Sequence, residues 1–464
     1  MLDRLFPADP ATRAVARELF KSIRNLPIVS PHGHTDPRWY AENLPFPDPA
    51  QLLVVPDHYV TRMLVSQGID LADLGVPRRD RGPVETDGRA IWRRFAENYY
   101  LFRGTPTQLW LDITLESLFG FAEPLTPETA DAAYDHIAQC LAQPGYRPRA
   151  LYERFNLEVV ATPDSALDDL GWHKAIRASG WTGRVVPTYR PDLIVDPDRP
   201  GFRAGLDRLA EMTGCDTAGW SGYLEGHRQR RAYFKSMGAT ATDHGHAIAL
   251  TADLGPEEAQ ALYQRVRSDS AGPQDRELFR AQMLTEMAQM SVEDGLVMQI
   301  HPGSRRNHSP EMFATYGPDQ GFDIPGRTDY VAALKPLLDR FGMEKRLTLI
   351  VFTLDESSYA RELAPLAGVY PALKLGPPWW FYDSPEGMLR FRKMATETAG
   401  FYNTVGFNDD TRAFPSIPAR HEVARRIDCA YLARLVVEHR LRETEAFEVA
   451  ADLAYTLPKR GYRL

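Results

Sequence analysis

Eight short apolar segments recur along the chain, and each ends in polar residues before a longer stretch with a helical pattern. They are LPIVSPH, NLEVVATPD, GRVVPTYRPD, GATATDHG, GLVMQIHPGS, LTLIVFTLDE, ALKLGPPWW and YNTVGFNDDTR. Apolar runs without strict alternation are typical of strands buried on both faces, as in parallel sheets with helical crossovers. Eight such units predict a closed (β/α)8 barrel, and a doubly wound open sheet is the alternative.

The segments are unevenly spaced. Roughly 120 residues separate the first from the second, far more than one crossover helix needs. This stretch contains AIWRRFAENYYLFRG and TPETADAAYDHIAQCLAQ, which have helical patterns. We therefore expect residues 1–464 to form a single barrel domain with a helical insertion at about residues 38–150.

Composition excludes several classes of protein. The net charge of −8 arises from mixed acidic and basic residues, and no basic stripe for nucleic acid is present. Three widely spaced cysteines argue against a disulfide framework. We found no signal peptide and no apolar stretch of about 20 residues that could cross a membrane. A cytoplasmic protein is expected, and the sequence leaves open whether it forms a homo-oligomer.

The predicted strand ends are rich in chemically active side chains. In IVSPHGHTDP, an extended chain directs His32 and His34 to the same face. The other ends carry Arg190, Asp243, His244, His301, Trp379, Trp380, Asp409, Asp410 and Arg412. Because barrel enzymes collect function at the carboxyl ends of their strands, we expect these side chains to converge.

Two imidazoles and a carboxylate, with positions left for substrate, are typical of a catalytic metal site. His32, His34 and Asp410 provide that set, and His301 is a candidate further ligand or a supporting hydrogen-bond donor. One divalent ion is expected. Zinc is the first choice, and these ligand types also accept manganese or iron.

Seven motifs, in order and over nearly the whole chain, resemble those of the uronate isomerase (glucuronate isomerase) family of the amidohydrolase superfamily. They are PHGH, DHYVTRMLVSQGI, PTYRPD, TDHG, MQIHPGSRRN, WWFYDSPEGM and DDTRAFPSIPARHEVARR. The chain departs from the familiar family pattern in PHGH, in Val60-Thr61-Arg62, in RRNHS and in NDDTR. These departures indicate a divergent subgroup.

The resemblance implies a distorted barrel of the metal-dependent hydrolase type and an aldose–ketose isomerase acting on hexuronates such as D-glucuronate and D-galacturonate. It places the metal ligands at His32, His34 and Asp410. It places substrate contacts at His58, Tyr59, Arg190, His301, Trp380 and Arg412.

The expected chemistry agrees with these residue types. A guanidinium group suits the carboxylate of a sugar acid, so Arg190 and Arg412 are candidates to bind it. Asp410 or Tyr59 is the candidate base for proton transfer between C2 and C1, with His58 assisting. Trp379 and Trp380 either pack in the core or form a wall of the sugar site.

Two other functions remain open at this point. The first is a mononuclear metal-dependent amidohydrolase or lactonase acting on a sugar-acid-like substrate. A binuclear hydrolase is less well supported, because the fourth segment, TATDHGH, contains no lysine and Lys235 precedes it. The second is a non-catalytic sugar-acid binding protein, which would not need His32, His34 and Asp410.

Overall fold

The structure is a computed structural model that describes residues 3–464. Seven parallel strands form one sheet in the order β1-β2-β3-β4-β5-β8-β9. They are β1 (Ile28–Ser30), β2 (Leu157–Ser165), β3 (Val185–Arg190), β4 (Ala241–His244), β5 (Val297–Ile300), β8 (Leu349–Val351) and β9 (Leu373–Leu375). Each coincides with one of the first seven predicted segments, and only β2 extends beyond its segment, by one residue, Ser165. A separate antiparallel hairpin pairs β6 (Ser304–Arg305) with β7 (Ile324–Pro325).

The eighth predicted segment closes the ring without forming a strand of its own. Thr404 makes a single parallel bridge with Leu375 at the end of β9. Further along, the amide of Asp410 donates to the carbonyl of His32 (3.2 Å), and the amide of His34 donates to the carbonyl of Thr411 (2.8 Å). The prediction of a full eighth strand is therefore wrong. The backbone turns at Gly406 and Asp410, where φ is +78° and +45°, so an extended ladder cannot continue.

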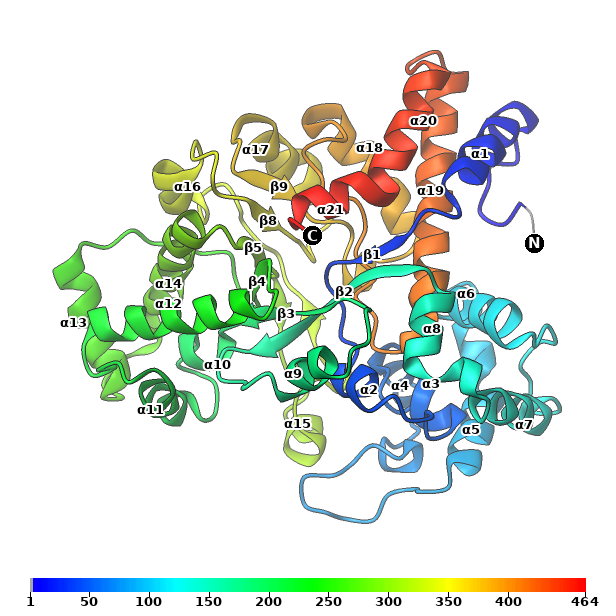
Figure 1. The fold of residues 1–464 in the computed structure, drawn as a ribbon, viewed down its shortest axis with the longest axis horizontal. Coiled ribbons are helices and arrows are strands. Elements are labelled where there is room, and N and C mark those ends of the chain that lie inside the picture. Colours follow the sequence, from blue (N-terminus) through cyan, green and yellow to red (C-terminus); the bar gives the residue numbers. More distant parts are fainter. Residues whose placement is uncertain (1–2) are drawn as a thin grey trace.

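Helices surround the curled sheet (Figure 1), which confirms the distorted barrel. Before β3 they are α1 (Pro10–Ile23), α2 (Pro37–Glu42), α3 (Pro49–Leu53), α4 (His58–Val65), α5 (Gly88–Glu97), α6 (Pro106–Thr114), α7 (Ala130–Leu141), α8 (Pro148–Arg154) and α9 (Gly171–Ala178). From β3 to β9 they are α10 (Asp192–Val195), α11 (Phe202–Thr213), α12 (Trp220–Ser236), α13 (Pro256–Arg267), α14 (Pro273–Asp294), α15 (Pro310–Tyr316), α16 (Lys335–Phe341) and α17 (Ala364–Val369). After β9 they are α18 (Pro385–Ala399), α19 (Ile417–Val437), α20 (Glu443–Ala451) and α21 (Leu457–Gly461).

Sequence signals set many of these helix boundaries. Proline occupies the first turn of many of the helices, where its missing N–H costs no hydrogen bond. The longest helix, α14, ends at Gly295 in the left-handed conformation (φ +80°). Helices α2 to α8 lie between β1 and β2, where the helical insertion is predicted. The assignment of the whole chain to one domain stays a prediction.

The inside of the barrel is packed with side chains. Ala241, Val297, Ile350 and Phe352 form one buried cluster with Trp379, Trp380, Val405 and Tyr59. Polar groups are consequently concentrated beyond the carboxyl ends of the strands. Within residues 3–464, no helix combines the length and the apolar character that a membrane span requires.

Candidate metal centre and active site

His32, His34 and Asp410 meet at the mouth of the barrel. The Nε2 atom of His34 lies 3.1 Å from Oδ1 of Asp410, and Nε2 of His32 lies 3.5 Å from the same oxygen. One potential ligand atom from each of the three residues lies within 4.8 Å of the corresponding atoms of the other two. The buried Oδ1 of Asp410 makes no properly oriented hydrogen bond. Nitrogen and carboxylate donors that converge without bonding one another fit a bound cation.

Backbone contacts hold this cluster, which we call the metal cluster, from both ends of the chain. The 408–411 segment approaches the PHGH turn so closely that a Cβ on Gly33 would lie 3.1 Å from Oδ1 of Asp409. Glycine at this position therefore permits the approach. Asp410 itself adopts φ +45°, a conformation that non-glycine residues adopt at a cost and that recurs at functional sites.

His301 is held beside the metal cluster by a carboxylate. Its Nδ1 lies 2.6 Å from Oδ1 of the buried Asp243, and its ring stacks on that of His32 at 4.6 Å. The Nε2 atom of His301 is buried without a hydrogen-bond partner. A carboxylate on one nitrogen fixes the tautomer and leaves the other nitrogen available for a metal or substrate. His32, Asp243 and His301 also form a second group with ligand-like spacing.

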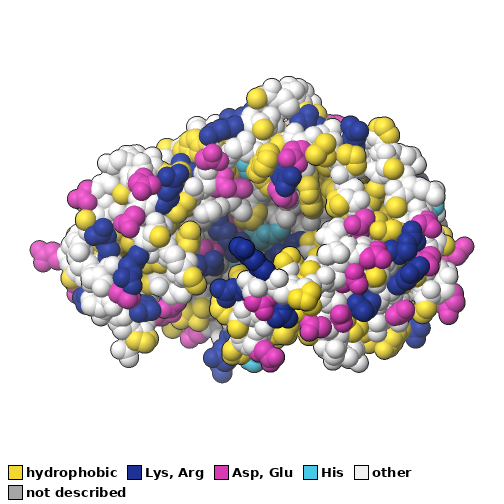
Figure 2. All heavy atoms as spheres, turned by 90° about the horizontal axis from the view of Figure 1, so that it is seen from below, with side chains coloured by type: hydrophobic (Ala, Val, Ile, Leu, Met, Phe, Trp, Pro, Cys, Tyr) yellow, Lys and Arg dark blue, Asp and Glu magenta, His cyan; other side chains and the backbone are white. Residues whose placement is uncertain are grey.

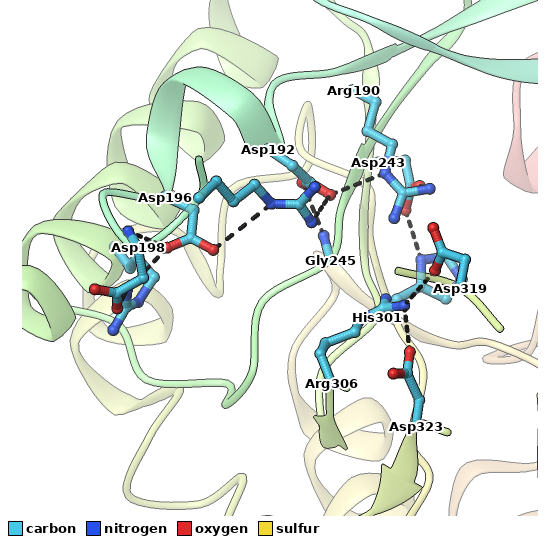
Figure 3. Close-up of polar contacts among 12 residues, drawn as sticks. Arg190, Asp192, Asp196, Asp198, Asp243, Gly245, His301, Arg306, Asp319 and Asp323 are labelled. Carbon is cyan, nitrogen blue, oxygen red and sulfur yellow. Dashed lines mark hydrogen bonds and ion pairs between the residues drawn. The ribbon is translucent and has the colours of Figure 1, made fainter. Parts of the chain in front are cut away.

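Arg190 extends this polar network across the ends of β3 and β4 (Figure 3). Its Nε donates to Oδ2 of Asp192 at 2.9 Å, and its Nη1 lies 3.5 Å from Oδ2 of Asp243. Asp192 also accepts from the amide of Gly245 (3.1 Å). The predicted carboxylate-binding Arg190 is therefore already anchored by two acids, and Nη2 is its least engaged nitrogen.

The first turn of α4 presents His58 and Tyr59. Asp57 caps this helix and accepts from the amide of Tyr59 at 2.9 Å, which fixes both side chains at the start of the helix. The His58 ring lies 5.4 Å from the ring of Trp380, and the buried Tyr59 hydroxyl has no hydrogen-bond partner. Trp379 lies edge-on to His301 at 4.8 Å. Both tryptophans are buried and also border the candidate site.

The loop between β5 and α16 adds charged groups that were not among the predicted site residues. Arg306 contacts Asp323 (2.9 Å) and Asp319 (3.4 Å), and its guanidinium lies over the Trp380 ring at 5.8 Å. Arg412, next to the metal cluster, has no carboxylate partner among residues 3–464. The face seen from below is hollowed at its centre, and histidine and basic side chains lie in the hollow (Figure 2).

Electrostatics separates the protonation states of the candidate groups. Burial raises the pKa of the Asp410 carboxyl, but the contacts with His32 and His34 outweigh this effect and hold its pKa well below the ordinary range. Burial, reinforced by the nearby Arg412, lowers the pKa of His58 well below its usual value. Burial, reinforced by the charge of Asp410, raises the pKa of Tyr59 well above its usual value. Asp410 is thus ionised, His58 neutral and Tyr59 protonated near neutral pH.

A buried ion-pair network lies behind the metal cluster and was also missed. Nε2 of His421 is 3.1 Å from Oδ2 of Asp409, and Nη1 of Arg420 donates to Oδ2 of Asp383 (3.0 Å) and to the carbonyl of Asp409 (2.9 Å). The adjacent Arg-His pair in PARHEV was the available signal. The sequence does not reveal that Arg420 and His421 pair with Asp383 and Asp409, because this pairing depends on how α19 packs against the barrel.

The structure brings the predicted site residues together, and comparison with known proteins identifies the family. A family model described as glucuronate isomerase matches residues 10–462. The chain belongs to this family. A uronate isomerase of Rhizobium meliloti (strain 1021) is 70% identical over 462 residues, which cover 100% of this chain and 98% of the relative.

Solved structures of the family agree with this assignment. Glucuronate isomerase from Caulobacter crescentus is 56% identical, with a TM-score of 0.98 and coverage of 100% of this chain and 96% of that chain. Uronate isomerase from Thermotoga maritima is 26% identical, with a TM-score of 0.92 and coverage of 100% and 99%. The predicted resemblance to the uronate isomerase family is confirmed. The hydrolase alternative is not favoured, since the matching family model and these relatives are isomerases.

Proposed function

We propose that this member of the glucuronate isomerase family interconverts hexuronates as aldoses and ketoses: D-glucuronate with D-fructuronate, and D-galacturonate with D-tagaturonate. The observation that carries the proposal is the metal cluster at the barrel mouth. Beside it lies Arg412, which forms no salt bridge within residues 3–464. A non-catalytic sugar-acid binder would have no use for this arrangement.

His32, His34 and Asp410 are the residues that would hold one divalent ion, with zinc as the proposed metal and manganese or iron as alternatives. Their ligand atoms lie within 4.8 Å of one another, and the buried Oδ1 of Asp410 has no hydrogen-bond partner, which fits such an ion. When bound, the ion supplies Lewis acidity to a carbonyl or hydroxyl oxygen of the sugar. His301, whose Nδ1 is occupied by Asp243, is the candidate additional ligand or hydrogen-bond donor to the substrate.

The reaction moves one proton from C2 to C1 of the sugar and one from the C2 hydroxyl to the C1 oxygen, through an enediol. We assign C2 deprotonation to Asp410, because its carboxyl is ionised. Tyr59 is the less suitable base, since its raised pKa keeps the phenol protonated. It is instead suited to donate a hydrogen bond to the developing negative charge on oxygen. Neutral His58 can carry the hydroxyl proton between the two oxygens.

Arginines position the substrate carboxylate in this scheme. Arg412 is the first choice because it forms no salt bridge with a carboxylate among the described residues, although its charge lowers the pKa of nearby Asp319. A guanidinium can bind a carboxylate at two points. Arg190 contributes through the nitrogen that its acids leave least engaged. Trp380 forms one wall between His58 and Arg306.

One assay tests the proposal. The purified, metal-loaded protein is incubated separately with D-glucuronate, D-galacturonate and a panel of sugar lactones and esters, and ketose and free acid are both quantified. We expect ketose from the hexuronates, loss of activity with a chelator and recovery on addition of zinc. Hydrolysis of a lactone or ester with no aldose–ketose exchange would overturn the assignment.

A further inference from the structure

A second hollow lies at the opposite end of β1 from the metal cluster. It is a cavity of about 560 Å³ lined by residues of α1, α6, α8 and α19. These helices gather on the same side of the barrel in Figure 1. Ile28 at the start of β1 and Asn156 just before β2 lie in its wall. The cavity therefore opens near the amino ends of the strands, whereas His32 and Asp410 lie beyond the carboxyl ends. Its volume is in the range of small-molecule sites.

The wall of this cavity is basic although the protein is acidic. It contains Arg24, Arg154, Arg425 and Arg426 and a single carboxylate, Glu422, which accepts from Arg426 at 2.8 Å. The chain as a whole carries a net charge of −8. Four arginines against one glutamate in one concave surface produce a local positive field that attracts and concentrates anions.

Arg425 lies in this wall and forms no salt bridge with an acidic residue in the described part of the chain. It is 6% exposed, and its Nη1 and Nη2 donate to carbonyls of the segment from Ile23 to Pro27, at 2.9–3.3 Å. These bonds fasten the end of α1 to α19. They do not involve Nε, which is buried without a hydrogen-bond partner. Burial lowers the pKa of Arg425 to about 10, so the group remains a cation at neutral pH and gains from an anion nearby.

The rest of the wall combines apolar and hydroxyl or amide groups. Phe20, Leu26 and Phe155 offer apolar surface. The hydroxyls of Thr114 and Ser117 donate to carbonyls of α6, so they can only accept from a ligand, and Asn25 and Asn156 add amide groups. Such a mixture suits a ligand with a carbon skeleton and several hydroxyl groups better than a bare inorganic ion. We propose that this cavity is a second ligand site, for a small polyhydroxylated organic anion of sugar-acid or sugar-phosphate chemistry.

The position of the cavity connects it to the metal cluster. Ile28 opens β1, and His32 follows two residues after that strand ends. His421 lines the cavity, and its Nε2 contacts Oδ2 of Asp409, the neighbour of Asp410. The cavity is thus bordered by Ile28, which lies shortly before His32, and by Pro415, which lies shortly after Asp410. An anion bound there would alter the constraint on these two parts of the chain and so change the rate at the metal centre.

Isothermal titration calorimetry on the full-length, metal-loaded protein tests the site. The probes are gluconate, glucose 6-phosphate, inorganic phosphate and neutral glucose. We expect at least one organic anion to bind and glucose not to bind. Arg24→Gln and Arg154→Gln, which remove exposed rim charges and should fold normally, should each weaken binding about tenfold. Arg208→Gln, on α11 far from the cavity, is the matched control and should retain binding.

Further arms separate this site from the active site. Binding of the same probe should survive Arg190→Met, which alters the barrel mouth. A saturating concentration of the probe should change kcat or KM for hexuronate conversion in the unaltered protein, and in Arg154→Gln the same change should require a higher concentration of the probe. Binding lost in Arg190→Met, unaffected by both rim variants, or as tight for inorganic phosphate as for the organic anions would overturn the proposal. Unchanged kinetics at saturation would overturn the connection to the metal cluster. The hexuronate assay itself decides the proposed function independently of these results.

Discussion

Replacing Asp243 with asparagine isolates the contribution of the carboxylate behind His301. Asp243 is 1% exposed, accepts from Nδ1 of His301 at 2.6 Å and lies 3.5 Å from Nη1 of Arg190. Asparagine has nearly the same shape, and its amide oxygen can still accept from Nδ1. The substitution therefore removes the charge while retaining the geometry, and the orientation of the His301 ring is no longer enforced by an ionic partner.

The magnitude follows from the hydrogen bond that is weakened. A hydrogen bond to a charged group contributes about 1.5–3 kcal/mol, and each 1.36 kcal/mol corresponds to about tenfold in rate. Because asparagine retains part of the hydrogen bond, the expected loss of free energy lies in the lower part of the range from about 1.5 to 3 kcal/mol. Loss of the carboxylate that hydrogen-bonds a metal-binding histidine typically lowers metal affinity or activity about 10–100-fold. We expect kcat/KM for D-glucuronate to fall about 10–100-fold in Asp243→Asn.

The assay is the initial rate of ketose formation, with metal content measured on the same samples. Asp294→Asn is the matched control, because it also removes a carboxylate from a buried arginine, Arg231 (2.7 Å), but on the outer helices. The control should lower thermal stability and leave kcat/KM within about twofold. Wild-type kcat/KM in Asp243→Asn, with normal metal content, would refute the role assigned to this carboxylate. A comparable loss in both variants would do the same.

Three further predictions concern the metal, the substrate and acid stability. His34→Gln should reduce bound metal and activity together, measured by elemental analysis and ketose formation; full metal occupancy would contradict the ligand set. Arg412→Met should raise KM for hexuronates at least about tenfold, and Arg412→Lys should partly restore it, because lysine keeps the charge and loses the two-point grip. Burial lowers the pKa of His227 to about 3 from an ordinary 6.5, so between these values the unfolded chain binds a proton that the folded chain does not. Stability should therefore fall as pH drops from about 6.5 toward 3, by at most about 1.4 kcal/mol per pH unit from this residue. Urea unfolding should show a shallower fall in His227→Gln, and parallel pH dependences would count against this reasoning.

The seven strands could be predicted because their signal is local. Each is a short buried run, and parallel strands covered on both faces need no information from distant residues to be recognised. The eighth segment, YNTVGFNDDTR, has the same local character, yet it makes one bridge and then turns. Its path is determined by hydrogen bonds to His32 and His34, which lie nearly the whole chain away. Local propensity could not indicate whether this segment would form a full strand or a single bridge followed by a turn.

The candidate site shows the same division between local and distant information. His32, His34 and Asp410 could be chosen because their residue types stand at predicted strand ends. The choice between Asp243 and His244 could not be made, since adjacent strand residues face opposite sides and the sequence does not say which side is the interior. In the structure Asp243 meets His301, while His244 contacts Thr242 within β4 at 3.0 Å. Ala241 shares the face of Asp243 and packs inside the barrel, which only the structure reveals.

The conformation of Asp410 explains why the metal cluster is a product of the whole fold. A non-glycine residue at φ +45° costs about 1–3 kcal/mol and persists only where the surroundings enforce it. Here the amide of Asp410 is bonded to His32, the next residue's carbonyl to His34, and the carbonyl before it to Arg420. Two separate parts of the chain, the turn after β1 and α19, therefore hold one strained residue in place, and they do so only when the ring is closed. The carboxylate thus reaches the two imidazoles because the barrel has closed, and a chain in which β9 and β1 were not joined through this segment would have the same residues without a site.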